Sequence, residues 1–266
     1  MKKKTVWTIV LTALVFLSGA FLGVSNVYRV DEVCVEASLV SEAAQAEVDG
    51  LQARLQSLYE SESAFKIQRE SAEEVLQDFP YFRITGFEKD YPNRIVVAIA
   101  EDEEVYAVAT GEENGSYYIL NGEGTVLGLR EGYKNRADGY DNVRIDGLKV
   151  TGEKGKALLG DDAVNMLFPL CQHASSCLNG IRRNIREIEV FRPASDETET
   201  AFIFKTVEGV KLYVSNPSSL GKEKVEIALN AYTGLSPEQK LTGMVVILDG
   251  TEGILSQYFQ EEWQGF

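Results

Sequence analysis

Histidine is almost absent from this 266-residue sequence, in which His173 is the only one. Zinc sites and catalytic triads that depend on histidine are therefore nearly excluded. Cys171 lies two residues before it, but residues i and i+2 of a helix do not face each other, so the two are not expected to form a catalytic pair. The sequence accordingly predicts no catalytic, metal-binding or cofactor-binding residue, and we expect a protein that is not an enzyme.

Cysteine is scarce as well. Cys34, Cys171 and Cys177 are too few, and odd in number, for a disulfide scaffold. Cys171 and Cys177 are spaced to pair across a short loop, which would leave Cys34 as a small buried residue of a strand. The alternative is that all three are unpaired and buried.

Basic side chains are outnumbered, because 26 lysines and arginines face 41 aspartates and glutamates and give a net charge of −15. A chain this acidic is a poor ligand for nucleic acid and is repelled by anionic lipid surfaces. Hydrophobic residues make up 44% and charged residues 25%, which predicts a packed core. Partners are therefore expected to be protein, uncharged glycan or something locally basic.

One long stretch lacks charge altogether. Residues 6–24 contain no charged side chain, and as a helix they would span about 28 Å, close to the roughly 30 Å hydrocarbon core of a bilayer. The lysines at 2–4 predict a cytoplasmic N-terminus with the rest of the chain outside. We expect a cytoplasmic tail at 1–5 and a single transmembrane helix at 6–27. The alternative is a secretory signal peptide, which shares the basic start and the apolar middle.

The first half of the region outside the membrane is predicted to begin with a strand and two helices. Valines recur from Tyr28 to Glu36, as in a short strand. Ser41 is expected to cap a helix, and Ser71 and Glu74 form a capping box for a second one. The first helix has an apolar stripe, which consists of Ala44, Val48, Leu51, Leu55 and Leu58.

Two further strands are predicted around Phe82–Ile84 and Ile95–Ile99, where apolar residues alternate with others. The segment Asp90–Asn93 between them contains Asp, Pro and Asn, which favour turns, so a turn is predicted there. A three-stranded sheet with both helices on one face would bury the apolar residues. Residues 28–101 are therefore expected to be one small domain.

Residues 102–250 are predicted to form a β-rich domain with helices. Asn114-Gly115 and Asn121-Gly122 are strong hairpin signals. A helix is expected over Asp161–Leu170, where Pro169 kinks or ends it, and an apolar stripe predicts another over Leu220–Tyr232. The predicted strands are Val105–Ala109, Ser116–Leu120, Thr125–Leu129, Ile185–Phe191, Phe202–Thr206, Val210–Tyr213 and Met244–Leu248. Residues 251–266 form an aromatic C-terminal tail, which either folds back over the sheet or binds a partner.

This order of features resembles FtsQ/DivIB-type bacterial cell-division proteins, in which a membrane anchor precedes a POTRA (polypeptide-transport-associated) domain and a β-domain. Four segments carry the resemblance: Val75–Phe82 (VLQDFPYF), Phe87–Val97 (FEKDYPNRIVV), Glu101–Ala107 and Tyr117–Leu127. They are similar to the family's proline-stopped helix, proline-containing turn, strand ending in glutamate and acidic-glycine hairpin. The fold class implied is α+β, with a single N-terminal transmembrane helix, a small POTRA-like β-α-α-β-β domain and a β-rich second domain with helices.

The resemblance also implies a function. Such a protein would be a non-enzymatic, single-pass scaffold in the cytoplasmic membrane at the division septum. Its implied partners are FtsL-type and FtsB/DivIC-type single-pass division proteins, through which it would influence septal peptidoglycan synthesis. One alternative is a membrane-anchored extracytoplasmic cell-wall hydrolase or transpeptidase. A further one is a POTRA protein that serves secretion, although such proteins usually carry tandem modules.

A partner-binding segment is expected near the C-terminus, because a family partner is thought to add a strand to the last strand of the β-domain. Residues 244–248 have no later predicted strand to pair with, so one row of backbone groups is expected to be open. The alternative is that this apolar strand is central to the sheet. The predicted partner-binding residues are Met244, Val245, Val246, Ile247, Leu248, Asp249 and Gly250, with Ile254 and Tyr258 covering the partner's apolar side.

Overall fold

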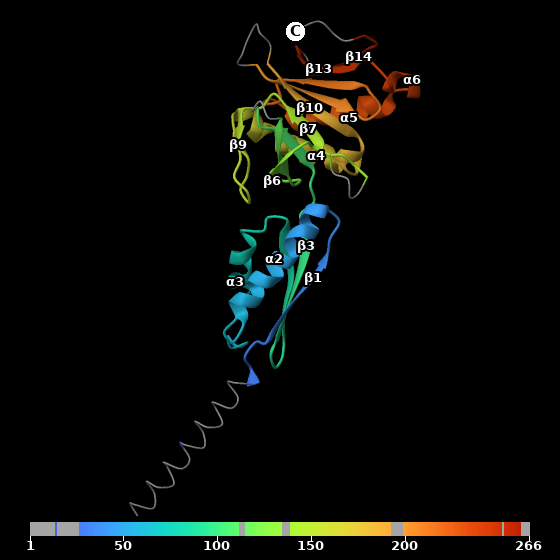
Figure 1. The fold of residues 1–266 in the computed structure, drawn as a ribbon. Helices are drawn as coiled ribbons and strands as arrows, with labels where there is room; N and C mark the ends of the chain where they lie inside the picture. The colour runs from blue at the N-terminus through green and yellow to red at the C-terminus, as the bar shows by residue number, and fades with distance from the viewer. Residues whose placement is uncertain are drawn as a thin grey trace, which may run out of the picture. The chain divides into compact units, whose positions relative to one another are not determined.

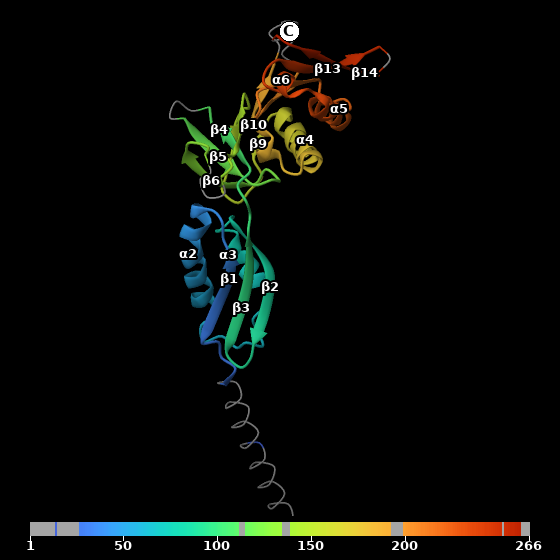
Figure 2. The same ribbon diagram turned by 90° about the vertical axis from the view of Figure 1, so that its right-hand side faces the viewer.

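The computed structural model describes Leu14 and residues 27–111, 115–134, 139–192, 199–251 and 253–261. The chain divides into two compact units, the first ending at Asp102 and the second beginning at Glu103. The elements of both units are drawn in Figure 1 and, from a second side, in Figure 2. The sequence prediction placed the domain boundary after residue 101.

The fold-class prediction requires one correction. The described helices and strands make an α+β protein, but none of these helices is long and apolar enough to cross a membrane. The predicted single transmembrane helix is therefore not part of the fold class that the structure supports. Apart from Leu14 and Val27, residues 6–27 lie outside the described residues, as do residues 1–5.

The first unit is a three-stranded sheet with two helices on one face (Figure 1). Its elements are β1 (Glu32–Ser38), α2 (Glu42–Tyr59), α3 (Arg69–Leu76), β2 (Phe82–Asp90) and β3 (Arg94–Glu101), which is the order that the sequence predicted. The sheet order is β1-β3-β2, with β1 parallel and β2 antiparallel to β3. Ile95, Val97 and Ile99 on β3 are buried toward the helices, whereas the alternate residues remain partly exposed.

Of the two helix caps predicted in this unit, the one at Ser41 is confirmed and the one at Ser71 is wrong. Ser41 caps α2 as predicted, because its side chain accepts a hydrogen bond from the amide of Ala44 at 3.1 Å. The capping box at Ser71 is wrong, since α3 begins at Arg69 and the Ser71 hydroxyl donates instead to the Gln68 carbonyl at 2.7 Å. On α2, Leu58 is 41% exposed and the neighbouring Tyr59 is buried in its place.

The second unit is built on a nine-stranded sheet whose order is β14-β13-β12-β11-β10-β7-β4-β5-β6. The strands are β4 (Tyr106–Ala109), β5 (Ser116–Leu120), β6 (Val126–Glu131), β7 (Val143–Asp146), β10 (Ile185–Phe191), β11 (Ala201–Thr206), β12 (Lys211–Ser215), β13 (Met244–Gly250) and β14 (Gly253–Phe259). A separate small ladder joins β8 (Val150–Thr151) to β9 (Leu159–Gly160). The sequence prediction lacked β7, β8, β9 and β14.

The helices of the second unit are α4 (Asp162–Leu178), α5 (Gly221–Gly234), the short α6 (Pro237–Lys240) and a 3₁₀ turn, η1 (Ile181–Arg183). The two long helices, α4 and α5, lie side by side, as Figures 1 and 2 both show, and pack on one face of the sheet. Pro169 does not end α4, which continues for two further turns to Leu178. The main core of the unit lies between these helices and the sheet, around residues such as Leu167, Phe202 and Val245.

The facing of β3 can be tested by one substitution. Val97→Asp is expected to lower the free energy of unfolding of the first unit by about 3–5 kcal/mol, because it buries an unpaired carboxylate at a fully buried position. Val96→Asp is the matched control, since Val96 lies on the opposite, partly exposed face of the same strand. Thermal unfolding followed by circular dichroism should show a large loss for Val97→Asp and less than half of it for the control. Equal losses would show that the two faces are wrongly assigned.

Candidate partner-binding edge of the second unit

The structure places the predicted partner-binding residues in two adjacent strands. Met244–Gly250 form β13, whereas Ile254 and Tyr258 lie in β14. β13 pairs in parallel with β12 and antiparallel with β14. The expectation of an open edge on β13 is therefore wrong, because both of its backbone rows face a neighbouring strand.

The predicted C-terminal tail at 251–266 explains the error. Its residues Gly253–Phe259 turn back and add an antiparallel strand, with Gly250 opposite Gly253 and Met244 opposite Phe259. The sequence does contain a signal for a hairpin here, since Asp249-Gly250 favours a turn and apolar residues follow at 254 and 258. The aromatic content of 251–266 predicts a segment that covers the sheet or binds a partner, and it does not reveal that Gly253–Phe259 pairs with β13.

β14 is the terminal strand of the sheet, and among the described strands only β13 pairs with it (Figure 1). Its sequence, GILSQYF, contains no charged residue and no proline. Edge strands of native proteins are usually shortened, bulged or protected by charges and prolines, because an open row of N–H and C=O groups invites pairing with another strand. Residues 254–258 therefore offer an unprotected template for strand addition.

The two faces of β14 differ. Ile254 and Tyr258 pack against the main core on the helix-covered face, and the Tyr258 hydroxyl donates toward the Thr242 carbonyl at 3.2 Å. On the other face Leu255 lies opposite Leu248 and is 60% exposed. The strand is thus anchored on one side and presents an exposed apolar side chain on the other.

A close backbone approach fixes the far end of the hairpin. Gly243 immediately precedes β13 and has a φ of +85°, and a Cβ there would lie 2.4 Å from the carbonyl oxygen of Phe259. A side chain at this position would both strain the backbone and push the end of β14 away. Glycine at 243 is therefore a requirement of the β13–β14 pairing.

A buried lysine holds the turn end of the same hairpin. The Lys224 side chain on α5 is fully buried, and its ammonium donates to Asp249 at 2.8 Å and to the carbonyls of Ser215 and Asn216 at 3.1 and 2.9 Å. The hydrogen bond from Lys224 keeps the pKa of Asp249 below its ordinary value. These contacts join the ends of β12 and β13 to the first turn of α5. Sequence reasoning missed Lys224 because a lysine on a helix is normally a solvated residue.

The opposite edge of the sheet is protected in the usual way. β6 carries Arg130 and Glu131, and the Arg130 guanidinium donates two hydrogen bonds of 2.9 and 2.8 Å to the carboxylate of Glu104. The Glu104 side chain is only 1% exposed. Charge on β6 opposes the approach of another strand, so the two edges of one sheet are chemically unlike.

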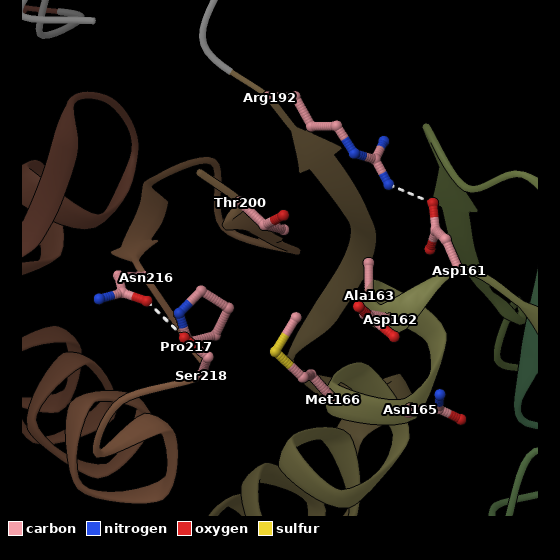
Figure 3. A pocket seen from close by; sticks show the side chains of 10 residues that line it. All are labelled: Asp161, Asp162, Ala163, Asn165, Met166, Arg192, Thr200, Asn216, Pro217 and Ser218. Carbon is pink, nitrogen blue, oxygen red and sulfur yellow. Dashed lines mark hydrogen bonds and ion pairs between the residues drawn. The ribbon is translucent and has the colours of Figure 1, made fainter. Parts of the chain in front are cut away.

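A separate cleft of about 750 Å³ lies at the start of α4 and is shown in Figure 3. Asp161 and Arg192 face each other across one side of it as an ion pair, and Met166 projects toward its centre. The Ser218 hydroxyl donates to the amide oxygen of Asn216 at 2.6 Å rather than to a base. No lining residue that the structure describes is paired as a nucleophile with a base, so the geometry of this cleft supports no acyl transfer.

The cysteines and the histidine form no catalytic arrangement in the described part of the chain. All three cysteines are free, so of the two alternatives the unpaired one holds, but only Cys171 is buried, since Cys34 is partly exposed and Cys177 is exposed. Burial raises the pKa of the Cys171 thiol. The His173 Nε2 atom lies 3.8 Å from both the Cys177 sulfur and a Glu226 oxygen, so one nitrogen faces both groups and the imidazole cannot relay a proton between them. Within the described ranges no group of histidine, cysteine and acidic side chains is arranged to hold a metal ion.

Comparison with known proteins gives no further identification, because no protein-family model and no curated protein matches this sequence. The likeness to the FtsQ/DivIB type rests on the sequence segments and their order alone.

The Lys224–Asp249 pair gives a prediction with a defined pH dependence. Asp249→Asn is expected to lower the free energy of unfolding by about 1–2 kcal/mol near neutral pH, less than for a fully buried pair, because the Asp249 side chain is 47% exposed. The folded-state pKa of Asp249 is lowered, so this stabilisation is complete above the unfolded-state pKa of about 3.9 and is lost as the pH falls through the folded-state pKa.

Denaturant unfolding at about pH 7 and about pH 2 measures both parts of this prediction. The difference between parent and variant should close at the acidic pH. Glu153→Gln is the control, because it removes an ion pair with Lys156 whose side chains are 70% and 67% exposed, and it should cost less than about 0.5 kcal/mol. A difference that persists unchanged at acidic pH would show that the Asp249 charge is not what stabilises the hairpin.

Proposed function

We propose that the chain is a non-enzymatic scaffold of the bacterial division machinery that binds an extended segment of a partner protein along β14. The unprotected, uncharged edge of β14 is the single observation that carries this proposal. The resemblance to FtsQ/DivIB-type proteins supplies the class of partner, which is an FtsB/DivIC-type division protein. The proposed interface thus moves from β13 to the next strand, and Ile254 and Tyr258 become part of its support.

Strand addition suits this edge for a physical reason. A partner strand gains main-chain hydrogen bonds along residues 254–258, and the side chains that alternate between the two faces provide specificity. The β13–β14 hairpin is already held by Lys224 at one end and by the Gly243 approach at the other. Because the template is ordered before binding, the partner alone loses conformational freedom.

The surface beside β14 indicates which side chains a partner strand should carry. Leu255 is exposed beside the partly buried Leu248 on the face without α4 and α5, so a partner strand with an apolar residue on that face would cover both. The chain carries a net charge of −15, which favours a neutral or basic segment over an acidic one. The expected ligand is therefore an extended, β-branched or aromatic segment with few acidic residues.

Such a scaffold acts by holding proteins together. The resemblance implies a second partner of the FtsL type and an effect on septal peptidoglycan synthesis, exerted without making or breaking a bond. The resemblance also implies that the two units would lie outside the cytoplasmic membrane, at the division septum.

Binding at β14 can be separated from general effects by two substitutions of equally exposed leucines. Leu255→Lys places a charge on β14, whereas Leu129→Lys places one on the opposite edge strand β6, and each parent leucine is 60% exposed. We expect the β14 variant to bind the FtsB/DivIC-type protein of the same organism about tenfold more weakly, equivalent to about 1.4 kcal/mol, and the β6 variant to bind as the parent does. Titration calorimetry on the full chain measures both.

A backbone test complements this pair. Pro scanning at Ser256 and Gln257 removes one amide donor at a time, and one of the two donors must point away from β13. The outward position should weaken binding with little change in the melting temperature, and the inward position should destabilise the hairpin. If Leu255→Lys and both proline variants remain folded and bind at full strength, the interface lies elsewhere.

The proposed location has its own test. Protease added to intact protoplasts is expected to degrade both described units, because they would lie outside the cytoplasmic membrane. Immunoblotting with antibodies against each unit follows the loss, and a cytoplasmic protein that survives shows that the protoplasts stay closed. Protection of either unit would contradict the proposed site of action.

A further inference from the structure

The large sheet of the second unit carries a second apolar cluster on the face opposite α4 and α5, which we call the outer face. Along β13, Val245 and Ile247 pack in the main core, and the residues that alternate with them belong to the second cluster. The buried members of this cluster are Ala201, Ile203, Tyr213, Met244 and Val246. Strands β11, β12 and β13 therefore share one apolar surface, and Phe191 of β10 and Phe259 of β14 extend it on either side.

The outer face is buried, although the long helices α4 and α5 lie on the opposite face (Figure 2). Met244 is 0% and Val246 2% exposed. A sheet face without a covering layer is normally solvated, as Leu255 is on the same face of β14, where 60% of its surface is exposed. The cluster therefore needs a cover from another part of the chain or from another molecule.

The described chain leads to this face and ends beside it. Phe259 closes β14 opposite Met244, and Glu261 is the last described residue. Residues 262–266 follow with the sequence EWQGF. An extended chain spans at most about 3.6 Å per residue, so Trp263 lies within about 14 Å of Phe259 and Phe266 within about 25 Å.

These lengths match the size of the cluster. It extends about 13 Å along β13 from 244 to 248, and about 19 Å across the sheet from β14 to β10. Both aromatic rings of residues 262–266 can therefore reach any part of it.

We propose that residues 262–266 fold over the outer face and bury Trp263 and Phe266 against this cluster. Tryptophan and phenylalanine rings remove more apolar surface from water than other side chains, so a segment of five residues suffices as a cover. Attachment to the end of β14 gives the segment an effective concentration in the millimolar range. A separate protein at lower concentration would have to bind this face much more tightly to displace it.

One other stretch outside the described residues adjoins the face. Residues 193–198 follow β10, whose Phe191 belongs to the cluster, and their sequence is PASDET. They contain no aromatic and no large aliphatic side chain, so they have little apolar surface with which to cover the cluster. Composition therefore assigns the cover to residues 262–266.

The charges around the cluster are compatible with this arrangement. Lys211 on β12 is the register neighbour of Met244, near the point where the chain leaves β14, and Glu261 and Glu262 directly precede Trp263. The acidic groups further along the face are Glu187 and Glu189, which both pair with Lys205, and Glu199, whose charge acts on Tyr213. The acidic start of the segment thus lies beside a cation, and its uncharged end crosses the apolar cluster.

The test follows Trp263 as the only tryptophan of the full chain, which Trp7→Phe achieves. A reference chain carries Trp7→Phe, Trp263→Phe and Leu129→Trp, because Leu129 is 60% exposed. We expect acrylamide to quench Trp263 about threefold less than the reference tryptophan, since a docked ring is removed from water. Phe191→Ser together with Leu248→Ser takes two apolar side chains from the cluster and should raise the quenching of Trp263 toward that of the reference, with circular dichroism as the folding control.

Deletion of residues 262–266 gives an independent measurement. It is expected to increase the binding of a hydrophobic dye and to lower the melting temperature by about 5 °C, whereas Gln264→Ala should change neither. Protection of Trp263 that grows with protein concentration would assign the cover to a second copy and overturn the proposal. Equal quenching of Trp263 and the reference, or a deletion that leaves dye binding unchanged, would overturn it as well.

Discussion

Backbone pairing in the nine-stranded sheet decides which of its strands could still pair with another strand. Seven of its strands have a partner on both sides, so their N–H and C=O groups are used within the sheet. Two edges remain, and only one of them, β6, carries charges. The C-terminal hairpin therefore determines how the described sheet ends. A strand that pairs with β13 cannot be removed without exposing an apolar inner strand to water.

The stability of that hairpin depends on satisfying a buried charge. Lys224 is fully buried, and an ammonium in such a place is tolerated only when carboxylate and carbonyl oxygens surround it. Asp249 supplies the carboxylate, and the backbone at Asn216, with a φ of +40°, turns its carbonyl toward the same nitrogen. The proposed binding edge is consequently ordered by contacts on the helix-covered face.

Local sequence signals predicted much of this structure, and they failed where the outcome depends on distant residues. The cap at Ser41 and the limits of β10 at Ile185–Phe191 follow from patterns of a few neighbouring residues and are confirmed. β7 was missed because VRID is only four residues long and becomes a strand by lying between β4 and β10. An open edge was expected on β13 because it is the last strand that the sequence predicts. The order of strands along the chain does not fix their order in the sheet, where β13 lies between β12 and β14. Lys224 was missed because burial of a charge is decided by the groups around it in space.

Recognition through backbone groups suits a chain with a net charge of −15. Association driven by long-range electrostatic attraction would limit such a protein to basic partners and would weaken steeply as the salt concentration rises. Main-chain hydrogen bonds, in contrast, do not depend on the net charge of the two chains. Side chains at the edge then need only avoid opposing the partner, which the uncharged GILSQYF segment does. The acidic surface, for its part, repels other copies of the chain and so protects the exposed edge from pairing with itself. An open strand edge that would favour aggregation on a neutral protein can thus remain available for a specific partner here.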